Sequence, residues 1–284
     1  LEQRPVAQAL GIPLLDPWAA ADGIVDGEPG GFVFRLSLKD SWAMARLLEH
    51  ARARGLRRPG LLTSANAWGR SSEAAARAWI SANPGLTLAG VEQLAWGAQT
   101  LLPQLQALRA AGADAVILVA NEAEGALLVR EVAALPRAER PPLLSHWGIT
   151  GGDFPSLCGP ALREVDLAVV QTFSFHGNRS PRAAQVLAAA RRAFGLSGPE
   201  AIRSPVGLAH AFDLTLILAR AVDLAGSTDR RRVRDALERV RGVDGLVRRY
   251  ERPFSPGRRE ALGPGDVFLA RWSAAGLLEP LPRR

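Results

Sequence analysis

The feature that most constrains this fold is a regular alternation of short apolar runs with longer amphipathic segments. The amphipathic segments repeat with the 3.6-residue period of helices, and the runs between them have the length of strands. The predicted strands cover residues 10–15, 32–36, 59–64, 87–94, 115–119, 142–145 and 168–173. The predicted helices between them cover residues 41–55, 71–83, 100–111 and 123–134. This pattern predicts an α/β fold with parallel sheets flanked by helices.

The alternation stops after residue 173, where three helical patterns follow with little strand between them. These helices are predicted over residues 181–194, 205–225 and 229–240, and strand-like runs return at 245–249 and 267–272. The simplest explanation is two Rossmann-like lobes between which the chain crosses near Leu38, Ser174 and Val243. One lobe then comprises residues 1–38 and 175–243, and the other comprises residues 39–174 and 244–284. The first lobe starts almost directly on a strand and receives only two strands from the N-terminal segment, which is a small sheet.

Hydrophobic residues make up 48% of the 284 residues, which suffices for packed cores. No run approaches the roughly 18 uninterrupted apolar residues of a membrane helix, and no signal peptide is present in the chain. A mature exported protein would also have lost its signal peptide. Composition therefore predicts a globular chain without fixing its compartment.

The net charge of +7 raises the question of nucleic-acid binding. Lys39 is the only lysine, and the arginines are spread along the sequence. The densest basic run, residues 229–235, is predicted to be the solvated start of a helix. The side chains expected on the buried side of that helix are Val233, Ala236, Leu237 and Val240. No nucleic-acid partner is expected.

Enzyme and metal signatures are mostly missing. The single cysteine, Cys158, has no partner for a disulfide or a zinc site, and the common nucleotide, hydrolase and metalloprotease motifs are absent. The catalytic alternative makes Cys158 or His146 the reactive group. The acids Glu122 and Glu124 are expected to cap a helix. We expect no catalytic residues, no metal and no cofactor.

Polar or aromatic residues recur just after the predicted strands. In parallel sheets these positions share one edge, which is where open α/β sheets bind ligands. The residues are Asp16, Trp18, Ser64, Asn66, Trp68, Asn121, Glu122, His146, Trp147 and Thr150. Three tryptophans in equivalent loops favour a shared aromatic pocket, and the alternative is that each fills the top of its own lobe. His146 lies in a glycine-containing loop, and the roles of ligand contact and structural hydrogen bonder both stay open.

Five segments in this order and spacing resemble a known family. They are residues 11–17, 65–70, 110–116, 207–214 and 250–262. The chain resembles, over essentially its whole length, the type I periplasmic binding proteins of ABC transporters, within the Leu/Ile/Val-binding, amide receptor-like group. The resemblance implies two lobes joined by three crossovers, with a ligand cleft between the lobes. It also implies a periplasmic or otherwise extracytoplasmic monomer that delivers a solute to a membrane permease and contacts the membrane only through that permease.

The resemblance also implies ligand contacts. The positions that match the family contacts are Trp18, Ala19, Ala20, Trp68, Asn121, Trp147 and Phe212. Family members that bind amino acids place a hydroxyl near Ala20 and an acid near Trp147, and both groups are replaced in this sequence. Asp16, Glu122 or Asp213 would then supply an acid.

These departures shift the expected ligand away from a standard branched-chain amino acid. The expected ligand is another amino acid, an amide, or an aromatic or cationic compound that tryptophans can stack against. The first strands and helices of the family are expected to precede Leu1. The competing binding function is a regulatory sensor of the same fold, in which ligand binding signals to a partner.

Overall fold

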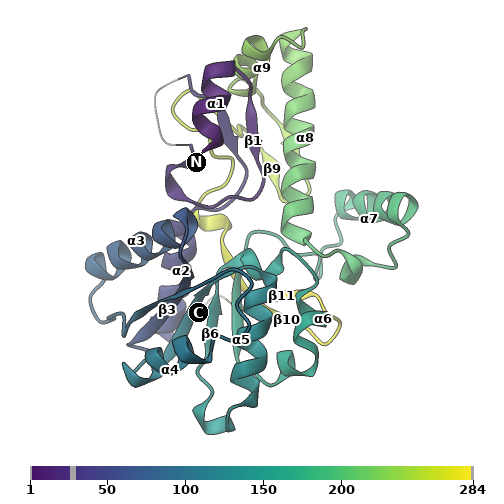
Figure 1. Ribbon diagram of the computed structural model, residues 1–284. Coiled ribbons are helices and arrows are strands. Elements are labelled where there is room, and N and C mark those ends of the chain that lie inside the picture. The colour runs from purple at the N-terminus through teal and green to yellow at the C-terminus, as the bar shows by residue number, and fades with distance from the viewer. Residues whose placement is uncertain (1, 26–29, 283–284) are drawn as a thin grey trace. The chain divides into compact units, whose positions relative to one another are not determined.

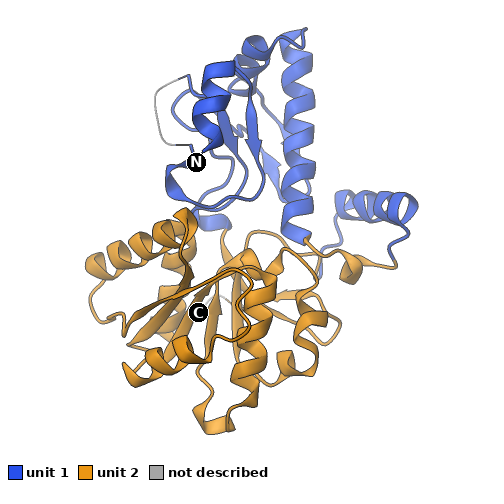
Figure 2. Cartoon of the chain, viewed as in Figure 1, with its two compact units in different colours: residues 1–39, 177–196, 205–266 blue, residues 40–176, 197–204, 267–284 orange. Residues whose placement is uncertain are grey.

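The computed structural model describes residues 2–25 and 30–282. The chain divides into two compact units (Figure 2). Unit 1 comprises residues 1–39, 177–196 and 205–266, and unit 2 comprises residues 40–176, 197–204 and 267–284. Each unit therefore collects segments that lie far apart in the sequence.

Unit 2 is built on a seven-stranded sheet with the order β11-β10-β7-β6-β5-β3-β4 (Figure 1). Neighbouring strands from β4 to β7 pair in parallel, and β10 and β11 add an antiparallel edge. The strands are β3 (Pro59–Ser64), β4 (Val91–Leu94), β5 (Ala115–Val119), β6 (Leu143–Ser145), β7 (Leu167–Gln171), β10 (Phe268–Trp272) and β11 (Leu278–Pro280). Every residue of β3, β5, β6 and β7 is buried, as expected for parallel strands covered on both faces.

Helices connect the parallel strands of unit 2 and cover its sheet. They are α2 (Asp40–Ala53), α3 (Ala67–Ala82), α4 (Leu102–Ala110), α5 (Glu122–Ala134) and α6 (Phe154–Cys158), with short 3-10 turns η2 (Arg137–Glu139), η3 (Trp147–Thr150), η4 (Gly159–Arg163) and η5 (Pro199–Ala201). Their apolar faces enclose a core that includes Leu105, Leu128, Val132 and Phe154. Each such side chain contributes about 1.5–3 kcal/mol by its burial.

Unit 1 has smaller sheets. Strands β1 (Leu14–Asp16) and β2 (Val33–Arg35) pair in parallel, and β8 (Val243–Asp244) and β9 (Arg249–Tyr250) pair antiparallel. Its helices are α1 (Gln3–Leu10), α7 (Pro181–Phe194), α8 (Pro205–Ala225) and α9 (Arg230–Leu237), with 3-10 turns η1 (Asp22–Ile24) and η6 (Pro264–Asp266). The segment around Glu260 extends the first sheet, because the Arg35 amide donates to the Arg259 carbonyl and the Ala261 amide donates to the Arg35 carbonyl.

The α/β fold class is confirmed, and α7 and α8 have the predicted bounds. Residues 3–10 form a helix that the sequence pattern did not predict, so the prediction that the chain starts on a strand is wrong. Helix α3 begins at Ala67 rather than at residue 71. The reason is that the Asn66 side chain caps the helix by accepting from the Gly69 amide at 3.0 Å, which places Trp68 in the first helical turn.

The division into units also differs from the predicted boundary at Val243. Residues 244–266 belong to unit 1. The Asp213 carboxyl group on α8 holds the first part of this segment through three hydrogen bonds. It accepts from the amides of Leu246 and Val247 at 2.5 and 2.9 Å, and from the Tyr250 hydroxyl at 2.8 Å. The chain therefore passes into the last segment of unit 2 after Asp266.

Among the described helices, α8 alone is long and apolar enough to cross a membrane by length and composition. Two of its polar side chains, His210 and Asp213, are buried and hydrogen-bonded to other parts of unit 1. These contacts are those of a core helix.

Candidate functional site

The carboxyl ends of the parallel strands in unit 2 bring several predicted site residues to one edge of the sheet. Helix α3 and the turn η3 begin just after β3 and β6 at this edge, and the loop to α5 follows β5. Trp68, His146 and Trp147 lie on these segments. Helix α2 begins at the same edge, since its first residue, Asp40, contacts two of them.

Asp40, Trp68 and His146 form a cluster at this edge, in which Asp40 and His146 are buried and Trp68 is half-buried. The Trp68 indole nitrogen donates to Asp40 Oδ1 at 3.1 Å. His146 Nε2 also lies 3.1 Å from that oxygen, although this contact is not aligned as a hydrogen bond. The ring centroids of Trp68 and His146 are 5.0 Å apart, edge to face, and the Trp147 ring centroid lies 6.1 Å from that of His146. The cluster fixes the Trp68 ring by both an edge-to-face ring contact and a hydrogen bond.

Two glycines permit this close packing. A Cβ atom on Gly148 would lie 2.3 Å from the Ala120 carbonyl oxygen and 2.5 Å from the Trp68 ring. A Cβ atom on Gly69 would lie 1.8 Å from the Ser64 carbonyl oxygen. Only glycine allows these backbone segments and the tryptophan to approach so closely.

The same edge holds buried polar atoms that lack a hydrogen-bond partner within the described residues. These atoms are Asp40 Oδ2, Thr63 Oγ1, Ser72 Oγ, His146 Nδ1, and both amide atoms of Gln171. Gln171 is the last residue of β7 and is fully buried. Native proteins pair nearly all buried polar groups, so a group of such atoms indicates a place for water or a ligand.

The remaining predicted residues of unit 2 surround this edge. Asn121 is exposed just before α5, and its side chain does not cap that helix. The half-buried Glu122 side chain packs against Gly152: a Cβ atom on Gly152 would lie 2.8 Å from Glu122 Cγ and Oε1. Glu124 accepts from the Gly97 amide at 2.9 Å, so it fastens a loop rather than capping α5. Trp147 is only 1% exposed and mainly fills the interior.

In unit 1, Asp16 organises the loop that follows β1. Its Oδ1 accepts from the amides of Trp18 and Ala19 at 3.0 and 2.8 Å. The Ser37 hydroxyl donates to the carbonyls of Trp18 and Ala19, both at 3.2 Å. Trp18 is half-buried, Ala19 is exposed and Ala20 is buried. Burial raises the pKa of Asp16, although the two amides and the Arg35 guanidinium favour its ionised form. This acid therefore shapes the loop.

His210 and Phe212 lie on α8 and contact other segments of unit 1. His210 Nδ1 lies 2.8 Å from the Pro17 carbonyl oxygen, so this nitrogen carries the proton and donates. Burial lowers the pKa of His210 to about 4, which makes it a neutral core residue at neutral pH. The Phe212 ring is half-buried, and the Arg182 guanidinium lies 5.9 Å from its centroid.

Sequence reasoning missed two residues of the unit 2 edge, Asp40 and Gln171. The sequence pattern predicts Asp40 to be a helix N-cap, because an acidic residue before an amphipathic segment commonly caps a helix. Gln171 lies inside the predicted strand 168–173, so no pattern marks it. The observed strand β7 ends at Gln171, two residues before the predicted end, and the sequence carries no signal for this earlier end.

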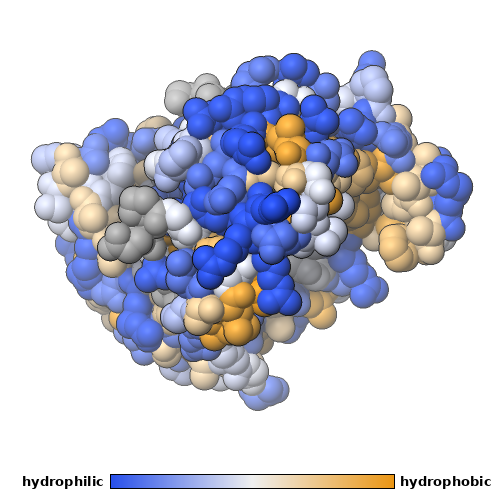
Figure 3. All heavy atoms as spheres, turned by 90° about the horizontal axis from the view of Figure 1, so that it is seen from above, coloured by the Kyte–Doolittle hydropathy of each residue, from blue (hydrophilic) through white to orange (hydrophobic). Residues whose placement is uncertain are grey.

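The structure weighs against thiol catalysis. Cys158 is 2% exposed, and burial raises the pKa of its thiol to about 12, so the nucleophilic thiolate is suppressed. On α9, Arg234 is buried against Glu238, whereas Arg230, Arg231 and Arg232 are exposed, as predicted for a solvated helix start. Among the described residues, no three histidine, cysteine or acidic side chains cluster as metal ligands. The face in Figure 3 is mostly hydrophilic, with small scattered apolar groups.

The chain has the type I periplasmic binding protein fold. Unit 2 contains a mostly parallel sheet, the chain divides into two units, and solved proteins of this type align with it. A family model described as periplasmic binding protein matches residues 2–276. The chain therefore belongs to the periplasmic binding protein family, whose members bind solutes. No curated protein matches the sequence.

Three solved structures illustrate the relationship. A type 1 periplasmic binding protein from Bordetella pertussis aligns with a TM-score of 0.85 at 21% identity, over 98% of this chain and 77% of that protein. A leucine-binding protein from Thermotoga maritima gives 0.77 at 18% identity, over 97% and 74%. A solute-binding protein of an ABC transporter from Rhodopseudomonas palustris, in complex with benzoate, gives 0.77 at 16% identity, over 98% and 72%. At these identities the similarity establishes the fold.

Proposed function

We propose that this protein is the extracytoplasmic solute-binding component of an ABC-type uptake system and that the carboxyl edge of the unit 2 sheet contacts the ligand. The observation that carries the proposal is the set of buried polar atoms without partners at this edge, beside the fixed Trp68 ring. A ligand that pairs these atoms supplies hydrogen bonds that the described residues do not supply.

The chemistry of this edge favours a ligand with a polar head and an apolar body. Asp40 Oδ2 is an acceptor that suits an ammonium or amide N–H group, and the Gln171 amide offers both a donor and an acceptor. The Trp68 ring provides an apolar or stacking wall. An amino acid, an amide or an aromatic cation has this combination.

The neighbouring structures support a small organic ligand without fixing which one. Their descriptions name leucine, benzoate and p-hydroxybenzoic acid as ligands or complexed compounds. Asp16, Trp18, Ala19 and Ala20 in unit 1, and Asn121, Glu122, His146, Trp147 and Phe212, stay predicted contacts. The proposed protein partner is a membrane permease that receives the solute from the monomeric binding protein.

A thermal-shift screen of the full chain tests the proposal. The panel contains amino acids, amides, aromatic carboxylates and aromatic cations, each at millimolar concentration. A bound compound raises the melting temperature in proportion to the logarithm of its concentration above Kd. We expect at least one ammonium or amide compound to do so. A flat response across the panel contradicts solute binding of these classes.

A further inference from the structure

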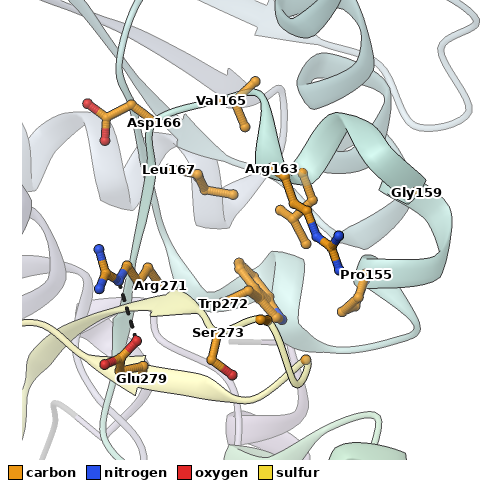
Figure 4. Close-up of a pocket in the computed structure, with 13 residues that line it drawn as sticks. Pro155, Gly159, Arg163, Val165, Asp166, Leu167, Arg271, Trp272, Ser273 and Glu279 are labelled. Atoms are coloured by element: carbon orange, nitrogen blue, oxygen red, sulfur yellow. Dashed lines mark ion pairs between the residues drawn. The ribbon is translucent and has the colours of Figure 1, made fainter.

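A second pocket lies in unit 2 at the amino end of β7, away from the carboxyl edge described above. We name it the amino-end pocket (Figure 4). Its volume is about 550 Å³, within the range of small-molecule sites. Its walls come from α6 and the turn η4 that follows it, the start of β7, and the β10–β11 hairpin. They include Pro155, Arg163, Asp166, Arg271, Trp272 and Glu279.

Trp272 gives this pocket an aromatic surface. Phe154 stacks on the indole at a centroid distance of 4.7 Å and an interplanar angle of 29°. This contact fixes the orientation of the half-buried Trp272 ring, which also lines the pocket. A ring held by its neighbour loses little conformational freedom when a flat ligand stacks on its accessible part.

The charged groups of the pocket leave one cation in excess. Arg271 faces Glu279 at 3.5 Å, and Asp166 is paired with Arg54 at 2.5 Å. The exposed Arg163 side chain forms no hydrogen bond or ion pair with any described residue. In Figure 4 its guanidinium lies on the side of the pocket where Pro155 and Trp272 lie. A guanidinium there matches a planar anionic group, because its N–H groups can bind a carboxylate in a bidentate manner.

We propose that the amino-end pocket binds a flat aromatic anion, with the ring against Trp272 and the anionic group at Arg163. This site is separate from the carboxyl edge, since the two lie at opposite ends of the sheet and share no residue. The amino-end pocket would select its ligand by stacking on Trp272 and by the charge of Arg163. The carboxyl edge instead offers the buried Asp40 carboxyl group and the Gln171 amide, so the two sites favour different ligand classes.

Calorimetric titration of the full chain with 2-naphthoate tests this proposal. Wild type is expected to bind the compound, and Arg163→Gln to weaken binding at least tenfold, while the matched control Arg220→Gln leaves it unchanged. Arg220 is an exposed arginine on α8 in unit 1, so its loss changes the net charge equally. The neutral 2-naphthamide is expected to bind at least tenfold more weakly than 2-naphthoate to wild type.

Trp272→Leu provides the second variant, because leucine keeps an apolar contact with Phe154 but removes the stacking surface. It is expected to weaken 2-naphthoate binding severalfold in protein whose melting transition is still cooperative. Absence of binding to wild type overturns the proposal, as does equal binding by wild type and Arg163→Gln. Binding that is lost in Asp40→Asn but kept in Arg163→Gln also overturns it, since the compound then occupies the carboxyl edge.

Discussion

At the scale of single residues, the buried ionisable groups of this protein have structural roles that their sequence context does not reveal. His210 has the position of a possible ligand contact, yet it donates to the Pro17 carbonyl and is fully buried. Asp16 has the position of a ligand acid; its Oδ1 holds the loop after β1, whereas its buried Oδ2 has no hydrogen-bond partner within the described residues. Burial and hydrogen bonding therefore define a structural role for His210, and Asp16 stays a predicted ligand contact.

The lowered pKa of His210 predicts a loss of stability in mild acid. The unfolded imidazole takes up a proton near its ordinary pKa of 6.5, whereas the folded one does so only near pH 4. The unfolded state therefore binds more protons between these values, and stability falls as pH falls. From pH 7.5 to pH 5 this group alone removes about 2 kcal/mol from the unfolding free energy.

Urea unfolding of wild type and His210→Asn at both pH values measures this effect. Asparagine keeps an N–H donor for Pro17 but does not titrate. The variant is expected to lose about 2 kcal/mol less than wild type on acidification, even if it is less stable at pH 7.5. Equal losses in the two proteins contradict a buried neutral histidine.

The close approach at Gly148 predicts a sensitive substitution. In Gly148→Ala the new methyl group meets the Ala120 carbonyl and the Trp68 ring, so one of them must shift. We expect about 1–3 kcal/mol of destabilisation, and weaker ligand binding because Trp68 moves. Gly257→Ala, whose Cβ meets no atom within 4 Å, is the matched control and should change stability by less than about 0.5 kcal/mol. Equal melting temperatures for the two variants would contradict the close packing of Gly148 against Ala120 and Trp68.

At the scale of elements, hydrophobic periodicity was sufficient for most helices and strands but not for the contacts that join them. The patterns for α7 and α8 gave the observed bounds, because both helices have continuous amphipathic or apolar runs. Helix α3 starts earlier than its pattern, since a side-chain cap extends it. The polar edge of unit 2 was predicted in part, because Trp68 and His146 follow strands, whereas the unpaired state of Gln171 depends on packing that no local pattern encodes.

The link between α8 and residues 244–250 depends on one carboxyl group. Asp213→Ala leaves two backbone amides and the Tyr250 hydroxyl without their acceptor, so we expect a loss of about 3 kcal/mol in unfolding free energy. Tyr250→Phe removes one of these bonds and is expected to cost about 1 kcal/mol. Chemical denaturation compares the two variants. A smaller loss in Asp213→Ala than in Tyr250→Phe would exclude this role for Asp213.

At the scale of the whole molecule, sequence and structure agree on the class of protein. The family match spans residues 2–276, and unit 2 has a mostly parallel sheet, as the predicted fold class requires. The predicted boundary at Val243 differs from the observed division, because the Asp213 contacts and the pairing of Arg35 with the segment near Glu260 are long-range. Such pairings leave no periodic signal in the sequence.

The central claim is that a small solute binds at the carboxyl edge of unit 2, and isothermal titration calorimetry tests it most directly. The ammonium or amide compound with the largest thermal shift is titrated into wild type, Asp40→Asn and the control Asp223→Asn, an exposed acid on α8. Asparagine keeps the acceptor for the Trp68 indole but removes the carboxyl group. We predict one site per chain, with affinity at least tenfold weaker in Asp40→Asn and unchanged in Asp223→Asn. Equal affinity in all three proteins, or no measurable binding to wild type, would contradict the account.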